Sequence, residues 1–243
     1  MKTYGIELET SSLSIRAAQS ALDAVNLSWS AKFDGTRGVD AEAVSPILDD
    51  GSLSESITAA RALLRAGATV NRQTGFHVHL GAAHYGNDGI AALVRNWYTA
   101  ADAIGALVAP SRLNNHFCTH TVPVNYLDDW AESIRNGNLD NSPVRNLQSY
   151  ARRYFSLNLE SYAKHGTVEF RLHHGTLNGK KIQAWAEFCE ALATFSTAGG
   201  ILDGGTGNRL NDINKILGKL VINESIKLDT ASYLKQRAIE LSA

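Results

Sequence analysis

TYGIELET, at residues 3–10, alternates apolar and polar residues along its length. Ile6 and Leu8 fall on one side of such a segment and Glu7 and Glu9 on the other, which is the period-two pattern of a half-buried strand. Two carboxylates on one strand face either meet water or bind something, because burying an unpaired charge is costly. This segment therefore directs attention to other strands that carry polar residues on one face.

Three further segments repeat the pattern. GFHVHL (75–80) alternates two histidines with apolar residues, residues 39–44 carry Glu42, and GTVEFR (166–171) carries an acid and an arginine two positions apart. If these strands are neighbours, one concave sheet surface collects seven polar side chains: Glu7, Glu9, Glu42, His77, His79, Glu169 and Arg171. We expect such a surface to be a functional site.

Helices are expected between and after these strands, because apolar residues recur there at steps of three and four. They are predicted over residues 13–25, 52–66, 88–108, 126–134, 180–196, 210–220 and 230–241, with Pro110 ending the third. Further strands are predicted over residues 29–33, 39–44, 153–159 and 167–173, the last two joined by a turn at His165-Gly166. This irregular order indicates an α+β fold with a mostly antiparallel sheet.

Composition narrows the class of protein. The 243 residues include 23 Lys+Arg and 24 Asp+Glu, a net charge of −1, which gives no strong sign of nucleic-acid or anionic-membrane binding. With 44% hydrophobic residues the chain is neither disordered nor collagen-like, and its length favours one large domain over residues 1–243. Residues 199–243 could form a helical C-terminal extension of that domain.

The cellular setting is expected to be the cytoplasm. Cys118 and Cys189 are too few for a disulfide framework and too far apart for a CxxC motif. The N-terminus places two Glu where a signal peptide needs an apolar run, and nowhere do 18 consecutive apolar residues occur. We therefore expect no membrane association and a small-molecule site.

Four carboxylates on one surface require cations, because like charges at short range repel and raise one another's pKa. Carboxylate oxygens with one or two histidines favour Mg²⁺ or Mn²⁺. In enzymes Mg²⁺ most often accompanies nucleotide phosphates, with an arginine supplying further positive charge, and Arg171 suits that role. Neither a GxxxxGK[ST] loop nor a GxGxxG motif after the first strand is present, so metals and side chains are expected to hold the phosphates.

The ordered set GIELE (5–9), DGT…GVDAEAVSP (34–46), GFHVHL (75–80), RYFSLNL (153–159) and GTVEFR…GTLN (166–178) resembles the amidoligase family. That family is related to the carboxylate–amine ligases typified by glutamine synthetase and γ-glutamylcysteine ligase. The resemblance implies a mostly antiparallel, saddle-shaped sheet with helices on its outer face. It also implies an ATP-dependent ligase with two or three Mg²⁺ or Mn²⁺ ions, which joins a small-molecule or peptide carboxylate to an amine through an acyl phosphate.

The resemblance also implies a role for individual residues. The metal ligands would be Glu7, Glu9, Glu42, His77 and Glu169. His79 would bind ATP phosphate and Arg171 the transferred γ-phosphate, so that Arg171, Glu169 and Glu42 serve catalysis. Asp34 and Asn158 match positions that would contact the substrate or the amine.

Each pair of residues also has an ordinary interpretation when taken alone. Two acids on one strand can be a solvated face, two histidines a structural or zinc-binding pair, and an acid beside an arginine a cross-strand ion pair. Their joint occurrence in one order favours the ligase. Three alternatives stay open: a metal-dependent hydrolase using the same cluster, a non-catalytic nucleotide-binding module, and a kinase on a related sheet. The identity of the two substrates and the oligomeric state are left open.

Overall fold

The computed structural model describes residues 2–147 and 153–242. Backbone contacts divide the chain into two compact units, each assembled from two separate stretches of sequence. Unit 1 comprises Met1–Gly81 and His173–Ala186, and unit 2 comprises Ala82–Leu172 and Glu187–Ala243. The single domain over residues 1–243 stays a prediction.

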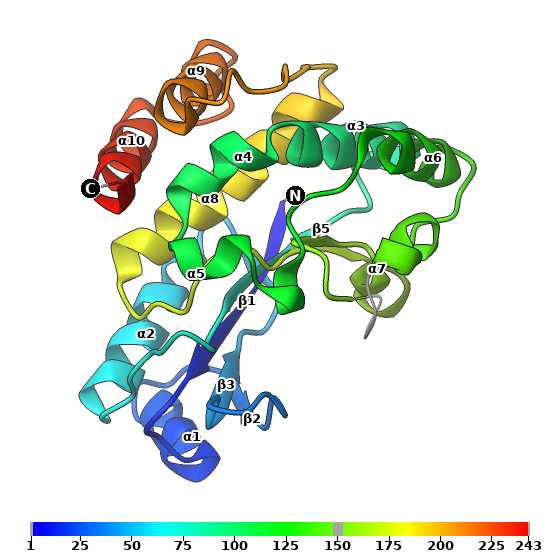
Figure 1. Ribbon diagram of the computed structural model, residues 1–243. Coiled ribbons are helices and arrows are strands. Elements are labelled where there is room, and N and C mark those ends of the chain that lie inside the picture. The colour runs from blue at the N-terminus through cyan, green and yellow to red at the C-terminus, as the bar shows by residue number, and fades with distance from the viewer. Residues whose placement is uncertain (1, 148–152, 243) are drawn as a thin grey trace. The chain divides into compact units, whose positions relative to one another are not determined.

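Antiparallel strands form the centre of unit 1 (Figure 1). They are β1 (Thr3–Thr10), β2 (Ser30–Lys32), β3 (Ala41–Val44), β4 (Leu48–Asp49) and β5 (Phe76–Gly81). Their order is β2-β3-β1-β5, with β4 paired to one end of β1. The strands predicted over residues 3–10, 29–33, 39–44 and 75–80 are thus confirmed, with β2 and β3 shorter than expected.

The register of these strands explains the alternating sequence. The β1–β5 pairing sets Glu7 opposite His77, and the β1–β3 pairing sets Glu9 opposite Glu42. On the other face, the alternate residues Ile6, Leu8, Phe76 and Val78 are buried. One face of the sheet is therefore core and the other carries the polar side chains, as the period of two requires.

Helices α1 (Ile15–Asp23) and α2 (Glu55–Arg65) belong to unit 1 and contact each other. The Ser14 side chain caps α1 by accepting a hydrogen bond from the Ala17 backbone N–H. Beyond α2, Gly67 has φ +97°, a conformation that glycine adopts without steric cost. Both helices were expected, and both are shorter than the expected ranges.

Unit 2 is largely helical. Its elements up to residue 172 are α3 (Gly86–Thr99), α4 (Ala101–Ile104), η1 (Gly105–Leu107), α5 (Pro110–Leu113), η2 (His116–Cys118), α6 (Val124–Arg135), η3 (Ser142–Leu147), β6 (Leu157–Asn158), α7 (Glu160–His165) and β7 (Thr167–Phe170). Helix α8 (Gly179–Thr197) passes from unit 1 into unit 2, and α9 (Arg209–Ile222) and α10 (Leu228–Ser242) follow. The helices expected near residues 126–134, 180–196, 210–220 and 230–241 are thus confirmed. Helix α3 packs on α6, and α9 packs on α10.

The helix predicted over residues 88–108 is confirmed only in part, because the segment is helical but interrupted. The segment divides into α3, α4 and η1, and the break falls at Ala100, whose φ of −93° and ψ of 11° depart from helical values. The carbonyl of the next residue, Ala101, accepts a hydrogen bond from His120 Nε2 at 2.6 Å. That partner is distant in sequence, so apolar periodicity contains no sign of it.

Pro110 was expected to end that helix and instead begins another. It occupies the first turn of α5, where the missing proline N–H has no helical partner to lose.

The two strands expected to be joined by a turn at His165-Gly166 are instead joined by a short helix. Strand β6 covers only Leu157–Asn158 of the expected 153–159, and helix α7 lies between it and β7. The Asn158 side chain accepts a hydrogen bond from the Glu160 backbone N–H at 3.0 Å, a local contact that favours helix initiation over a longer strand. Gly166, at φ +64°, then ends α7 and leads into β7.

The fold is therefore α+β with an antiparallel sheet, as expected. The saddle shape and the outer-face helices typical of glutamine synthetase relatives stay a prediction. Within residues 2–147 and 153–242, none of the helices combines the length and apolarity needed to cross a bilayer.

Candidate functional site

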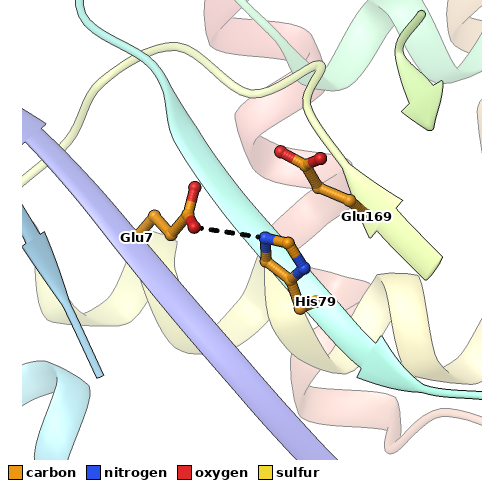
Figure 2. A group of neighbouring side chains, drawn as sticks. All are labelled: Glu7, His79 and Glu169. Atoms are coloured by element: carbon orange, nitrogen blue, oxygen red, sulfur yellow. Dashed lines mark ion pairs between the residues drawn. The ribbon is translucent and has the colours of Figure 1, made fainter. Parts of the chain in front are cut away.

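Unit 1 gathers six of the expected site residues into one group, which we call the carboxylate cluster. Its members come from β1, β3, β5 and the turn after β2: Glu7, Glu9, Asp34, Glu42, His77 and His79. Figure 2 shows two of them, Glu7 on β1 and His79 on β5, with the ion pair between them.

The Glu7 carboxylate contacts both histidines of β5. Its Oε2 lies 3.0 Å from His77 Nδ1 and its Oε1 lies 3.3 Å from His79 Nε2. Burial raises the pKa of Glu7, but the hydrogen bonds and charges of the two histidines outweigh burial and hold the pKa well below its usual value. Glu7 is therefore an ionised carboxylate at neutral pH.

Glu9 is held from two directions. Its Oε2 accepts a hydrogen bond from the Gly75 backbone N–H at 2.6 Å, and its Oε1 lies 3.5 Å from His77 Nε2. His77 thus contacts both acids of β1, one through each ring nitrogen. Glu9 and His77 are both almost fully buried, so their side chains have defined positions.

Glu42 is an acid of the cluster whose ionised form is disfavoured. Burial raises its pKa to about 8, and the negative charges of Glu7, Glu9 and Asp34 add to that effect, while Lys32 opposes it. Like charges directly opposite one another in a sheet destabilise it, and Glu9 and Glu42 are such a pair. Without a cation, burial and the neighbouring carboxylates therefore disfavour the ionised form of Glu42.

Two overlapping groups within the cluster have the spacing of a metal site. One ligand atom each from Glu7, Glu42 and His77 lie within 4.8 Å of one another, and so do ligand atoms from Glu9, Asp34 and Glu42. Carboxylate oxygens with a single imidazole suit Mg²⁺ or Mn²⁺, and a divalent ion would favour the ionised form of Glu42, which burial and the neighbouring carboxylates disfavour. The donor set thus fits a hard divalent cation.

Unit 2 carries the other three expected residues, which we call the Glu169 cluster: Asn158, Glu169 and Arg171. Glu169, drawn in Figure 2, lies on β7, and Asn158 is its direct partner on β6. The Asn158 amide donates to Glu169 Oε2 at 2.6 Å, and Arg171 forms an ion pair with Glu169 Oε1. In this cluster one carboxylate is matched by one guanidinium and one amide.

Arg112 is a functional candidate that the sequence analysis missed. It is 2% exposed, and its guanidinium donates to the carbonyl of Leu172 at 3.1 Å and to the carbonyl of Arg171 at 2.8 Å. By binding the carbonyl of Arg171, this buried arginine fixes the position of the Arg171 backbone and so helps to position the Arg171 side chain. The sequence offers no local sign of it, because the contacts join residues about 60 positions apart.

All nine expected site residues therefore lie in one of two clusters, six in unit 1 and three in unit 2. Asp34 lies beside the carboxylates Glu9 and Glu42. Its Oδ1 also accepts a hydrogen bond from the Thr36 backbone N–H at 2.9 Å, which shapes the turn after β2. The roles in metal, phosphate and substrate binding stay predictions.

Comparison with protein families agrees with this geometry. The family model described as "Putative amidoligase enzyme" matches residues 25–193, which is more than half of the chain. The chain belongs to this family. An amidoligase is an enzyme of the ligase type that forms amide bonds, so this is the class of activity to which the chain is assigned. No curated protein matches the chain.

The family match has one informative limit. It includes Asp34, Glu42, both histidines of β5 and the whole Glu169 cluster, but it begins after Glu7 and Glu9. These two acids of the amidoligase join the site through strand pairing: β1 lies between β3 and β5, and His77 contacts both of them. Their place beside the other acids follows from this strand pairing, and their role as metal ligands stays a prediction.

Proposed function

We propose that this amidoligase is ATP-dependent and joins a carboxylate to an amine through an acyl phosphate. The observation that carries the proposal is the carboxylate cluster, where four acids lie together and the pKa of Glu42 is raised to about 8. Such a cluster is costly for the fold unless it binds cations, and divalent cations are the usual partners of nucleotide phosphates.

The proposed metal ligands are those that the family resemblance implies: Glu7, Glu9, Glu42, His77 and Glu169. Bound there, Mg²⁺ or Mn²⁺ would neutralise phosphate oxygens and so lower the barrier to phosphoryl transfer. The chain itself prepares these ligands. The Gly75 N–H orients Glu9, and His77 holds Glu7 in its ionised form.

His79 and Arg171 are the proposed phosphate ligands. His79 is oriented by Glu7, and Arg171 is oriented by Glu169 through its side chain and by Arg112 through its backbone. A guanidinium has five N–H donors, so it can pair with a carboxylate and still donate to phosphate oxygens. Arg171 is proposed to bind the γ-phosphate as it moves.

The proposed reaction has two steps. A carboxylate oxygen of the substrate attacks the γ-phosphorus of ATP, the bond to the β,γ-bridging oxygen breaks, and ADP leaves. The amine nitrogen then attacks the carbonyl carbon of the acyl phosphate, the carbon–oxygen bond to phosphate breaks, and the amine loses a proton as inorganic phosphate departs. Positive charge from Arg171 stabilises the phosphate oxygens in both steps. Asp34 and Asn158 are the proposed contacts for the substrate or the amine.

The test is to trap the acyl phosphate with hydroxylamine in place of the amine. Purified protein is incubated with ATP, Mg²⁺ and a panel of amino-acid and peptide carboxylates, and hydroxamate and ADP are measured together. We expect equal amounts of both with at least one carboxylate, and a loss of about 100-fold in Glu169→Gln. Glu132→Gln, a change at an exposed acid of α6, is the matched control.

Two results would contradict the proposal. One is the absence of carboxylate-dependent ADP release across the panel. The other is Zn²⁺-supported hydrolysis without nucleotide, which would favour the hydrolase alternative.

A further inference from the structure

The Glu169 cluster continues into a chain of buried amides. The Asn158 amide nitrogen donates to Glu169 Oε2 at 2.6 Å, and the Asn141 amide nitrogen donates to Asn158 Oδ1 at 2.7 Å. Asn141 Oδ1 in turn accepts a hydrogen bond from the Leu159 backbone N–H at 3.0 Å. Hydrogen-bond donors are thus aligned in one direction, toward the Glu169 carboxylate.

Backbone groups fix that direction. A backbone N–H can only donate, so the atom facing Leu159 N–H must be the oxygen of Asn141, and its NH₂ must face Asn158. The Glu160 N–H donates to Asn158 Oδ1 at 3.0 Å in the same way, which leaves the Asn158 NH₂ for Glu169. If the Asn158 amide rotated by 180°, its oxygen would face Glu169 Oε2 and its NH₂ would face the Glu160 N–H. If the Asn141 amide did so, its NH₂ would face the Leu159 N–H and its oxygen would face Asn158 Oδ1.

Burial makes the arrangement specific. Asn141 is 0%, Asn158 2% and Glu169 5% exposed. In the protein interior a hydrogen bond is stronger than in water, and a buried polar group without a partner costs more free energy. A network in which every group has a partner therefore favours a single conformation. The two oxygens of Glu169 also have separate partners, Asn158 at Oε2 and Arg171 at Oε1.

We propose that Asn141 is a positioning residue of the active site, which acts through Asn158 to hold the Glu169 carboxylate in the orientation needed to bind a metal ion. The inference rests on the proposed function, in which Glu169 is a metal ligand. Residues that orient a metal ligand through a hydrogen bond contribute to metal affinity without touching the metal.

The variant Asn141→Asp tests the direction of the chain. A carboxylate at position 141 can only accept, so the Asn158 amide would turn its NH₂ toward it and its oxygen toward Glu169. Two acceptors would then face each other, and Glu169 would leave its present orientation. Asn141→Ser, too short to replace the donor at the same distance and uncharged, separates this effect from the added charge.

The measurement is Mn²⁺ binding, followed by the loss of the free-ion signal in electron paramagnetic resonance, alongside the melting temperature of each variant. We expect the Kd of at least one Mn²⁺ site to rise about tenfold or more in Asn141→Asp and about threefold in Asn141→Ser. Asn138→Asp, the same change at an exposed position nearby, should bind Mn²⁺ like the wild type. A purely structural role would lower the melting temperature and leave Mn²⁺ binding by the folded protein unchanged.

Wild-type Mn²⁺ affinity in the folded Asn141 variants would overturn the inference and leave the proposed function standing. If Asn141→Asp does not fold, Asn141→Ser decides by the same criterion. Asn141-dependent Mn²⁺ binding without any binding of ATP would support the inference and contradict the ATP dependence. A wild-type protein that binds no Mn²⁺ would overturn both.

Discussion

The two clusters of candidate site residues differ in how their buried carboxylates are paired. The carboxylate cluster of unit 1 places four acids beside two histidines, and burial together with the neighbouring negative charges raises the pKa of Glu42 to about 8. The Glu169 cluster of unit 2 matches one acid with one guanidinium and one amide. The first is suited to acquiring cations, and in the second the acid is paired with donors from neighbouring side chains. Substitutions should therefore affect stability in opposite directions in the two clusters.

The largest effect is expected at Arg171. Arg171→Met removes the partner of a carboxylate that is 5% exposed, and breaking a buried ion pair typically costs about 3 kcal/mol or more of stability. Ligase activity should fall by about 100-fold or more, because the γ-phosphate loses its proposed arginine. Chemical denaturation and hydroxamate assays measure the two effects. Unchanged stability in a folded Arg171→Met would break the contrast between the clusters.

Arg112 should give the next largest effect. Arg112→Met leaves the carbonyls of Arg171 and Leu172 without their buried donor, at a cost of about 1–3 kcal/mol for each unsatisfied group. The KM for ATP should rise more than kcat falls if Arg112 only positions Arg171. Denaturation and steady-state kinetics check both expectations. A variant as stable as the wild type would show that Arg112 does not hold the backbone of Arg171.

Glu42 tests the opposite behaviour of the carboxylate cluster. Its pKa in the folded, metal-free protein is raised to about 8 from 4.5, so between these values the folded protein holds a proton that the unfolded chain has lost. Stability should therefore fall as pH rises from about 5 to 8, and Mg²⁺ should stabilise the protein more at pH 8 than at pH 6.

Glu42→Gln has no proton to lose and should flatten this dependence. Melting curves with a chelator and with Mg²⁺, taken at several pH values, provide the measurement. The same pH slope in wild type and variant would show that repulsion at Glu42 is not a significant cost of the cluster.

The smallest effect is expected at Gly5, which lies opposite His79 in the β1–β5 pairing. A methyl group there would lie 3.2 Å from His79 Cβ, so His79 must move by a few tenths of an ångström. Gly5→Ala should weaken binding of Mg²⁺ and nucleotide by about threefold while the fold is retained. Gly218→Ala, where an added Cβ meets no atom within 4 Å, is the matched control. Equal binding by both variants would show that the position of His79 is unimportant.

The sequence predicted most of the carboxylate cluster, because its members on strands follow a simple rule, whereas Asp34 lies in a turn. Residues at alternate positions share a face, so Glu7 with Glu9 and His77 with His79 could be placed together before the pairing of their strands was known. The same rule placed Glu42 on the third strand.

What the sequence could not predict depends on contacts between distant residues. The break at Ala100 coincides with a hydrogen bond from His120 to Ala101, and the roles of Arg112 and Asn141 depend on partners 17 to 60 positions away. Helix α7 follows from a local Asn158 contact that the strand pattern obscured. Polar residues inside a fold are specified by their partners, and periodicity describes only which face a residue occupies.

The central claim is that the carboxylate cluster binds divalent cations together with a nucleotide. Its most direct test is calorimetric titration of the metal-stripped protein with a non-hydrolysable ATP analogue, in the presence of Mg²⁺, of Zn²⁺ and of neither. We expect binding that requires Mg²⁺ and is lost in Glu42→Gln and Glu169→Ala. Tight Zn²⁺ uptake with no nucleotide binding under any condition would contradict it.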